Sequence, residues 1–135
     1  MSILVDTSAW VHALRRKGDP VVRDRVSQLL ADNQALWCDV VRLELWQGAR
    51  DGGERKFLRE METEIRSLPV TQEVWDTACN VGAFARSRGL TVPSTDLVIF
   101  ACAQVNKVGL EHNDQHFSRL SDMIVASRIP SRYGE

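Results

Sequence analysis

Short apolar runs alternate with longer amphipathic segments along this chain. The first run, Ile3-Leu4-Val5, contains three β-formers without a polar break, which is typical of a strand buried on both faces in a parallel sheet. The longer segments carry apolar residues at the three- and four-residue spacing of helices. The pattern predicts an α/β fold with strands over residues 3–5, 35–38, 67–70 and 110–113, and a further edge strand over residues 123–130.

Capping residues and glycines place the predicted helices between these strands. The first helix begins after Asp6 with Thr7 or Ser8 as its cap, and it ends with Lys17 before Gly18. The segment from Leu97 to Ala103 is apolar all round, which is typical of a central, buried helix. Further helices are predicted over residues 20–33, 39–50, 53–65, 71–89 and 94–107, and after residue 114.

Composition sets the broad class of the protein. The 135 residues are 44% hydrophobic and 26% charged, which fits one globular domain over residues 1–135. No apolar run reaches the length of a bilayer span, and no basic leader precedes the first run, so we expect a cytoplasmic protein without a membrane segment. Cys38, Cys79 and Cys102 lie far apart in apolar segments, which favours buried, reduced thiols over disulfides or a zinc site.

The formal net charge of −1 gives the chain no overall positive field that would attract a polyanion. Any contact with nucleic acid therefore has to use local patches or metal ions. Candidates for contacting an RNA backbone are Arg15, Arg16, Lys17, Arg50, Arg86 and Arg88. The alternative is ordinary solvation, and for the three cations that end the first helix it is complementation of the helix dipole.

Four carboxylates stand at informative positions. Asp6 ends the first strand, and Asp114 repeats that pattern after the predicted strand 110–113. In open α/β sheets ligands bind at the carboxyl ends of the strands, although either acid is also an ordinary helix cap. Asp96 lies in the first turn of the apolar helix, where stabilisation of the helix dipole is the alternative role.

Glu44 differs from the other three because it lies inside a helix. Its neighbours one turn away are Val40, Val41 and Gly48, so its carboxylate leaves from the apolar face. An unpaired buried carboxylate costs several kcal/mol, so Glu44 must meet a cation, a metal or water in a cleft. The alternative is an edge position from which the side chain reaches solvent.

Taken together, Asp6, Glu44, Asp96 and Asp114 suggest one acidic pocket. Converging carboxylates repel one another and raise each other's pKa, so an ionised pocket of this kind requires divalent cations. Hard oxygen ligands point to Mg²⁺ or Mn²⁺ rather than to zinc.

At these positions the chain resembles the PIN-domain family, and specifically the VapC-type toxin ribonucleases of toxin-antitoxin pairs. The resemblance covers essentially the whole chain and rests on four motifs: residues 3–8, Glu44 with Gly48, Asp96 before an Ala-rich apolar helix, and residues 110–117. It implies a three-layer α/β/α domain with a short, mostly parallel central sheet of four to five strands.

The resemblance also implies an activity and partners. Asp6, Glu44, Asp96 and Asp114 become the metal-binding and catalytic set of a Mg²⁺- or Mn²⁺-dependent endoribonuclease that hydrolyses RNA phosphodiester bonds. Thr7 and Ser8 become supporting residues, with Ser8 orienting Asp6 by a hydrogen bond. The implied partners are an RNA substrate, a VapB-type antitoxin and a second copy of the chain in a homodimer.

One position departs from the family pattern. Members often carry a further acid two residues after the position of Asp114, where this chain has His116. His116 is a candidate for a phosphate contact or a proton carrier, and an ordinary surface imidazole is the alternative.

Two other functions compete with the nuclease. A Mg²⁺-dependent phosphohydrolase of the haloacid-dehalogenase kind needs a second Asp where this chain has Ser8. A non-catalytic PIN-like module for protein interaction remains open, although it leaves the four acids without a purpose.

Overall fold

Four parallel strands form the central sheet of the computed structural model, which describes residues 1–127. Their order across the sheet is β3-β2-β1-β4, and every pair is parallel. The strands are β1 (Ile3–Val5), β2 (Ala35–Cys38), β3 (Arg66–Leu68) and β4 (Gly109–Glu111). The predicted parallel sheet is confirmed with four strands, and β1 and β2 start and end at the predicted residues.

Strand β1 lies inside the sheet, because Ile3 pairs with Ala35 of β2 on one side and with Gly109 of β4 on the other. Helices cover both faces of the sheet, so Leu4 and Val5 are both fully buried. This explains why the strand reads as a continuous apolar run rather than as an alternation of polar and apolar residues.

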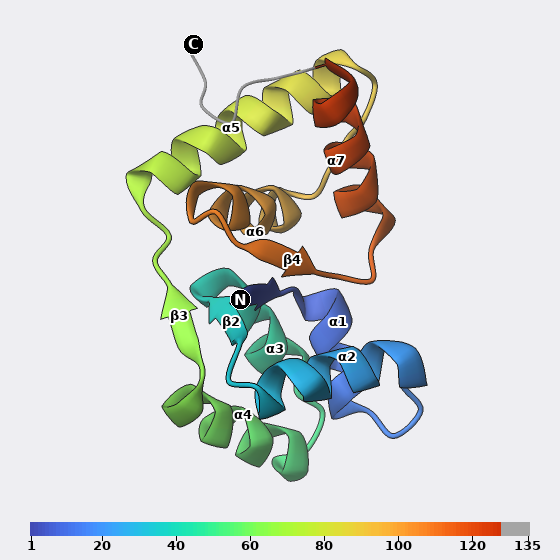
Figure 1. Cartoon of the computed structure of the whole chain (residues 1–135), viewed down its shortest axis with the longest axis vertical. Helices are drawn as coiled ribbons and strands as arrows, with labels where there is room; N and C mark the ends of the chain where they lie inside the picture. Colours follow the sequence, from blue (N-terminus) through green and yellow to red (C-terminus); the bar gives the residue numbers. More distant parts are fainter. Residues whose placement is uncertain (128–135) are drawn as a thin grey trace.

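Seven helices within residues 1–127 complete a three-layer α/β/α arrangement. In Figure 1, α5, α6 and α7 lie above β1 and β4, and α1 to α4 lie below them. The helices are α1 (Thr7–Leu14), α2 (Pro20–Ala31), α3 (Asp39–Gly48), α4 (Gly52–Glu64), α5 (Gln72–Ser87), α6 (Ser94–Val105) and α7 (Gln115–Ser127). Helix α7 is the last element within the described residues.

Helix α6 is the buried helix that the sequence predicts. Six consecutive residues from Val98 to Ala103 are buried, and the helix packs along α5. The approach to α5 is close, since a methyl group added at Gly82 would lie 2.8 Å from Leu97 Cδ1. Burial of residues Val98 to Ala103 fixes the position of α6, and with it the first turn that carries Asp96.

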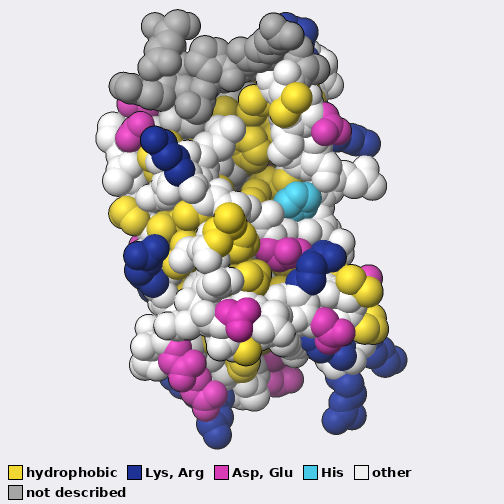
Figure 2. All heavy atoms as spheres, viewed as in Figure 1, with side chains coloured by type: hydrophobic (Ala, Val, Ile, Leu, Met, Phe, Trp, Pro, Cys, Tyr) yellow, Lys and Arg dark blue, Asp and Glu magenta, His cyan; other side chains and the backbone are white. Residues whose placement is uncertain are grey.

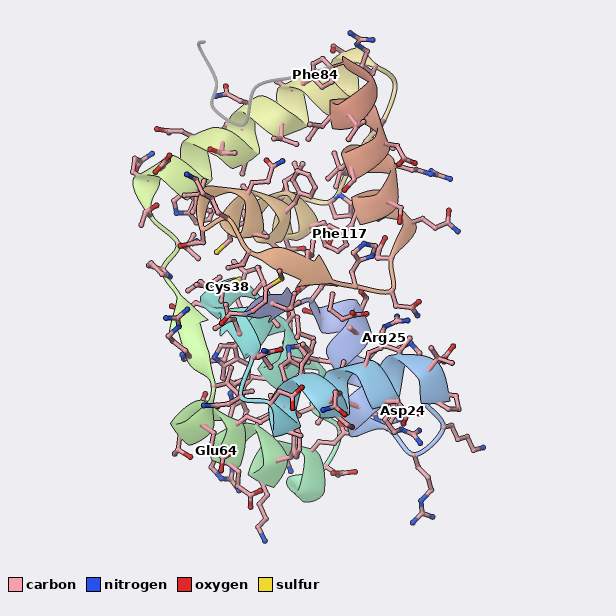
Figure 3. All side chains as sticks on the ribbon, viewed as in Figure 1. Asp24, Arg25, Cys38, Glu64, Phe84 and Phe117 are labelled. Atoms are coloured by element: carbon pink, nitrogen blue, oxygen red, sulfur yellow. The ribbon has the colours of Figure 1, made fainter. Side chains whose placement is uncertain are left out.

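Contacts between distant segments hold β4 and α7 in place. Figure 3 shows Arg25 reaching from α2 toward β4, where its Nε lies 2.8 Å from Glu111 Oε2. Phe117, also labelled in Figure 3, lies between α7 and α6 and is fully buried, with its ring 5.1 Å from that of His112. The loop between β4 and α7 is therefore anchored at both ends.

Three sequence-based expectations are wrong. The strand predicted over residues 123–130 is helical up to Ser127, and its remaining residues lie outside the described part of the chain. Helix α1 ends at Leu14 rather than at Lys17, and its cap is Asp6 rather than Thr7 or Ser8. Cys79 is exposed, whereas Cys38 and Cys102 are buried thiols as predicted.

None of the helices within residues 1–127 combines the length and the apolar character needed to cross a membrane.

Candidate active site and metal centre

Four different elements deliver the predicted acids to one edge of the sheet. Asp6 follows β1, Asp114 follows β4 by three residues, Asp96 lies in the first turn of α6, and Glu44 projects from α3. The ends of β1 and β4 are joined directly, because the Asp6 amide donates to the Glu111 carbonyl at 2.9 Å. The carboxyl ends of the parallel strands thus form the rim of the site.

The electrostatics of Asp96 show that the four acids come together. Its side chain is 13% exposed. Burial raises the pKa of Asp96 to about 6, and the negative charges of Asp6, Asp114 and Glu44 add to this rise. The four carboxylates therefore lie close enough for their charges to act on one another.

One carboxylate oxygen of Asp6 accepts hydrogen bonds, and the other has no hydrogen-bond partner among the described residues. The residue is 2% exposed, and its Oδ2 accepts hydrogen bonds from the Ser8 amide at 2.9 Å and the Ser8 hydroxyl at 2.6 Å. Its Oδ1 is buried and has no hydrogen-bond partner among residues 1–127. Burial raises the pKa of Asp6 despite the two bonds from Ser8, which favour the ionised form.

Ser8 connects Asp6 to the other side of the site. While its hydroxyl donates to Asp6, the same oxygen accepts the Asn113 amide at 2.8 Å. The turn between β4 and α7 is thereby fixed against the start of α1. The expectation that Ser8 binds Asp6 by a hydrogen bond is confirmed.

Glu44 is half-buried and is tied to Thr7. The Thr7 hydroxyl donates to Glu44 Oε1 at 2.8 Å, which links α1 to α3 across 37 positions of the sequence. Outside the backbone of α3 itself, no atom of residues 1–127 lies within 4 Å of a methyl group built at Gly48, so space remains one turn along the helix. Thr7, Glu44 and Gly48 line the same narrow pocket.

Asp114 and His116 form the outer part of the site. Asp114 is 30% exposed, and its Oδ1 accepts the His116 amide at 2.8 Å, as a helix cap does. The His116 Nδ1 lies 2.9 Å from Asp114 Oδ1 and 3.4 Å from Asp96 Oδ2, but neither contact has the angle of a hydrogen bond. His116 thus belongs to the acid cluster and is not an isolated surface imidazole.

The donor set fits a divalent cation. Ligand atoms of Asp96, Asp114 and His116 all lie within 4.8 Å of one another. Asp6 Oδ1 adds a buried oxygen that lacks a partner among the described residues. Carboxylate oxygens with one imidazole suit a hard or borderline cation, and such a charge would offset the repulsion among the acids.

Two residues near the site were not singled out from the sequence. His12 Nδ1 accepts the Asp19 amide at 2.8 Å, and His12 Nε2 lies 3.0 Å from Asn113 Nδ2. The backbone amide of Asn113 in turn donates to Ser8, so a series of contacts runs from the α1–α2 turn to Asp6. The His12–Asn113 contact joins positions 101 residues apart, which no local pattern reveals.

The parallel α/β fold and the acid cluster at the carboxyl ends of its strands define a class of protein whose side chains are placed to hold a cation. A family model described as the PIN domain matches residues 3–123, so the chain belongs to the PIN-domain family. Ribonuclease VapC18 of Mycobacterium tuberculosis (strain ATCC 25618 / H37Rv) is 34% identical over 125 residues, which are 90% of this chain and 88% of that protein. Ribonuclease VapC11 of the same strain is 30% identical over 132 residues, or 93% and 98% of the two chains.

Solved structures show the same fold at lower identity. VapBC2 from Rickettsia felis, bound to a DNA fragment from its promoter, superposes with a TM-score of 0.71 at 15% identity, covering 89% of this chain and 93% of that one. FitAcB from Neisseria gonorrhoeae superposes with a TM-score of 0.69 at 22% identity, with the same coverage. VapBC-1 from nontypeable Haemophilus influenzae gives 0.70 at 19% identity, over 90% and 94% of the two chains.

Proposed function

We propose that this protein is an endoribonuclease that hydrolyses RNA phosphodiester bonds with Mg²⁺ or Mn²⁺, and that it is the toxin of a VapBC-type toxin-antitoxin pair. The observation that carries the proposal is the convergence of carboxylates from four separate elements, whose charges act on Asp96. In addition, Asp6 Oδ1 is buried and has no hydrogen-bond partner among residues 1–127. The PIN-domain match and the relatives named as VapC ribonucleases support the same activity.

The roles of the acids follow from their surroundings. Asp6, Glu44, Asp96 and Asp114 would hold the cation, with Asp6 offering the oxygen that Ser8 leaves free. When bound, Mg²⁺ or Mn²⁺ supplies a Lewis acid that lowers the pKa of a water molecule and offsets negative charge on phosphoryl oxygens.

Supporting residues keep the carboxylates in fixed orientations. Ser8 holds Asp6 Oδ2 and Thr7 holds Glu44 Oε1, so neither carboxylate has to reorganise when substrate binds. We propose that His116 takes the place of the further acid found in related proteins, because its Nδ1 lies beside both Asp96 and Asp114. An imidazole there binds a cation or contacts a phosphate without adding a fifth negative charge.

The proposed partner is a small VapB-type antitoxin. Two of the similar structures are named as VapBC assemblies, which supports a partner of this kind for the present chain. We also propose that the toxin is a homodimer.

The experiment is a cleavage assay on total RNA, with mapping of the cleaved ends, in Mg²⁺, in Mn²⁺ and in chelator. We expect cleavage with either cation, none in chelator, and none by the Asp96→Asn variant. Asp24→Asn is the matched control, because it makes the same chemical change at an exposed position on α2. Cleavage in chelator, or a fully active Asp96→Asn variant, would refute the proposal. A correctly folded protein that cuts nothing would favour the non-catalytic interaction module.

A further inference from the structure

A cluster of cations adjoins the acidic site. Arg15, Arg16 and Lys17 form the turn between α1 and α2, and together with Arg50 and His12 they line a cavity of about 540 Å³. Figure 2 shows Lys and Arg side chains projecting at the lower right of the molecule, where Figure 1 places this turn. We call this feature the basic cavity.

The turn that carries these cations is held in one conformation by Arg23. The guanidinium of Arg23 donates to four backbone carbonyls, those of His12, Arg15, Arg16 and Gly18, at 2.9 to 3.3 Å. Gly18 packs so closely that an added Cβ would lie 2.3 Å from the His12 carbonyl oxygen. Cations on such a turn are positioned in advance, which reduces the entropy lost when a ligand binds.

Complementation of the helix dipole does not explain the cluster well. That role requires cations beside the free carbonyls at the end of α1, but Arg23 already satisfies carbonyls of this turn. No acid among residues 1–127 forms an ion pair with Arg15, Arg16 or Lys17, whereas Arg50 pairs with Glu54 at 3.1 Å. Three cations are therefore left without an acidic partner in the described part of a chain whose net charge is −1.

Two features connect the basic cavity with the acids. Arg15 lines the basic cavity and also a narrow neighbouring pocket whose wall includes Thr7 and Glu44. On the other side, His12 belongs to the wall of the basic cavity and is linked through Asn113 and Ser8 to Asp6. A ligand that extends out of the acidic site along α1 therefore meets these cations next.

We propose that the basic cavity binds backbone phosphates of the RNA strand, on one side of the bond that is cut at the acid cluster. The inference rests on the proposed nuclease function and adds to it a defined path for the substrate. A nucleic-acid strand fits both halves of this surface, because its backbone presents one phosphate to the acids and further phosphates to the cations at regular intervals. RNA is the strand that the proposed function cuts. The carbonyl-bound Arg23 is a positioning residue in this arrangement.

The test is the triple variant Arg15→Gln, Arg16→Gln, Lys17→Gln, measured in two ways. The first is the affinity for a fluorescein-labelled single-stranded RNA in chelator, by anisotropy over a range of salt concentrations. Each lost phosphate contact lowers the slope of log K against log salt by about 0.7, so we expect the slope to fall by about 2 and the affinity at 0.1 M salt to fall by about tenfold or more. The second is cleavage in Mg²⁺, where we expect a higher KM with little change in kcat.

The chain contains a matched control. Arg55, Lys56 and Arg59 on α4 are exposed, and their replacement by Gln removes the same residue types and the same charge away from the basic cavity. We expect this control to bind and cut like the parent. If the first triple fails to fold, the double variant Arg16→Gln, Lys17→Gln alters only exposed side chains and should lower the slope by about 1.4.

The outcomes separate this inference from the proposed function. A parent protein that cuts RNA, together with a triple variant whose KM and salt slope match the parent, overturns the basic cavity as an RNA site while the nuclease function stands. Equal losses in both triple variants would overturn it as well, because they indicate a general effect of charge. A parent that does not cut RNA refutes the proposed function and this inference with it.

Discussion

Replacing Asp96 by Asn should make the cation-free protein more stable. In the folded protein, burial and three neighbouring carboxylates disfavour the charge on Asp96, and its pKa rises from 3.8 to about 6. Above pH 6 Asp96 is ionised in both states, and its charge has a higher free energy in the folded state than in the unfolded state. Asparagine has nearly the same shape and no charge, so it removes this cost.

The magnitude follows from the difference between the two pKa values. A shift of roughly two pH units corresponds to at most about 3 kcal/mol, since each unit is worth about 1.4 kcal/mol. Water reaches this cleft and screens the charges, which brings the expected gain to about 1–2 kcal/mol. For a chain of this length that gain raises the Tm by roughly 3 to 8 °C.

The dependence on pH has a definite sign. Between pH 3.8 and about 6, the folded state binds more protons at Asp96 than the unfolded state does, so the contribution of Asp96 to stability falls as the pH rises through this window. We therefore expect the Tm of the Asp96→Asn variant to exceed that of the parent at pH 7.5. The difference should shrink toward zero at pH 4.

The assay is thermal unfolding in chelator at pH 4 and at pH 7.5, for the parent, Asp96→Asn and the control Asp24→Asn. Figure 3 labels Asp24 on α2, where it is exposed, so this variant should melt like the parent at both pH values. An Asp96→Asn variant that melts at or below the parent at pH 7.5 would refute the reasoning. It would show that Asp96 stabilises the fold, as an ordinary acid in the first turn of a helix does.

Three further substitutions test the supporting residues. Ser8→Ala removes the 2.6 Å hydrogen bond to Asp6, and the affinity for Mn²⁺ measured by calorimetry should fall by about 10- to 100-fold. Thr7→Val keeps the side-chain shape but frees Glu44, so kcat for RNA cleavage should fall by about tenfold or more, while Thr63→Val at an exposed position of α4 should cut at the parental rate. Arg23→Met removes the donor to four carbonyls of the α1–α2 turn, so the free energy of unfolding measured by chemical denaturation should fall by about 2 kcal/mol. An unchanged free energy of unfolding would show that the turn does not depend on Arg23.

Local sequence patterns placed Asp6 and Asp114 after strands and Asp96 in the first turn of a helix, as the structure has them. Leu4 and Val5 of the first run and residues Val98 to Ala103 of α6 are buried, and unbroken apolar runs of this kind can be recognised from composition alone. Because both lie in the core, their ends are fixed, and the carboxylates at those ends are fixed with them. Taken together, these positions suggest that the acids converge, whereas the local pattern does not decide whether Glu44 faces a cleft or solvent.

The expected edge strand over residues 123–130 shows where local patterns mislead. Ile124 and Val125 are β-branched and favour a strand when they are read alone. The structure instead continues α7, because Phe117, Leu120 and Ile124 stand at the i, i+3, i+7 spacing of one helical face, with Phe117 and Leu120 buried and Ile124 packed against the core. Burial of this face outweighs the weaker preference of two adjacent residues.

The hydrogen bonds that orient the site could not have been read from the sequence. The contact of Thr7 with Glu44 spans 37 positions, and that of Ser8 with Asn113 spans 105. Such pairs depend on how the strands and helices pack in three dimensions. Hydroxyl and amide groups are also so common that their positions in the sequence do not identify which two of them will bind. The bond from Ser8 to Asp6 joins residues two positions apart, and it was expected from the resemblance to the PIN-domain family rather than from spacing.

The arrangement of the site explains why it stays intact even though its acids repel one another. The pKa values of Asp6 and Asp96 are both raised, so the fold bears a cost at neutral pH in the absence of a cation. Either residue could relieve that cost by turning toward solvent, but each is attached to a segment whose neighbouring residues, such as Val5 and Ile99, are fully buried. Moving the carboxylate would expose apolar surface worth about 25 cal/mol per Å², and exposing one such side chain costs as much as the repulsion saves. The core therefore keeps the carboxylates close together, and this closeness is the property that a divalent cation requires.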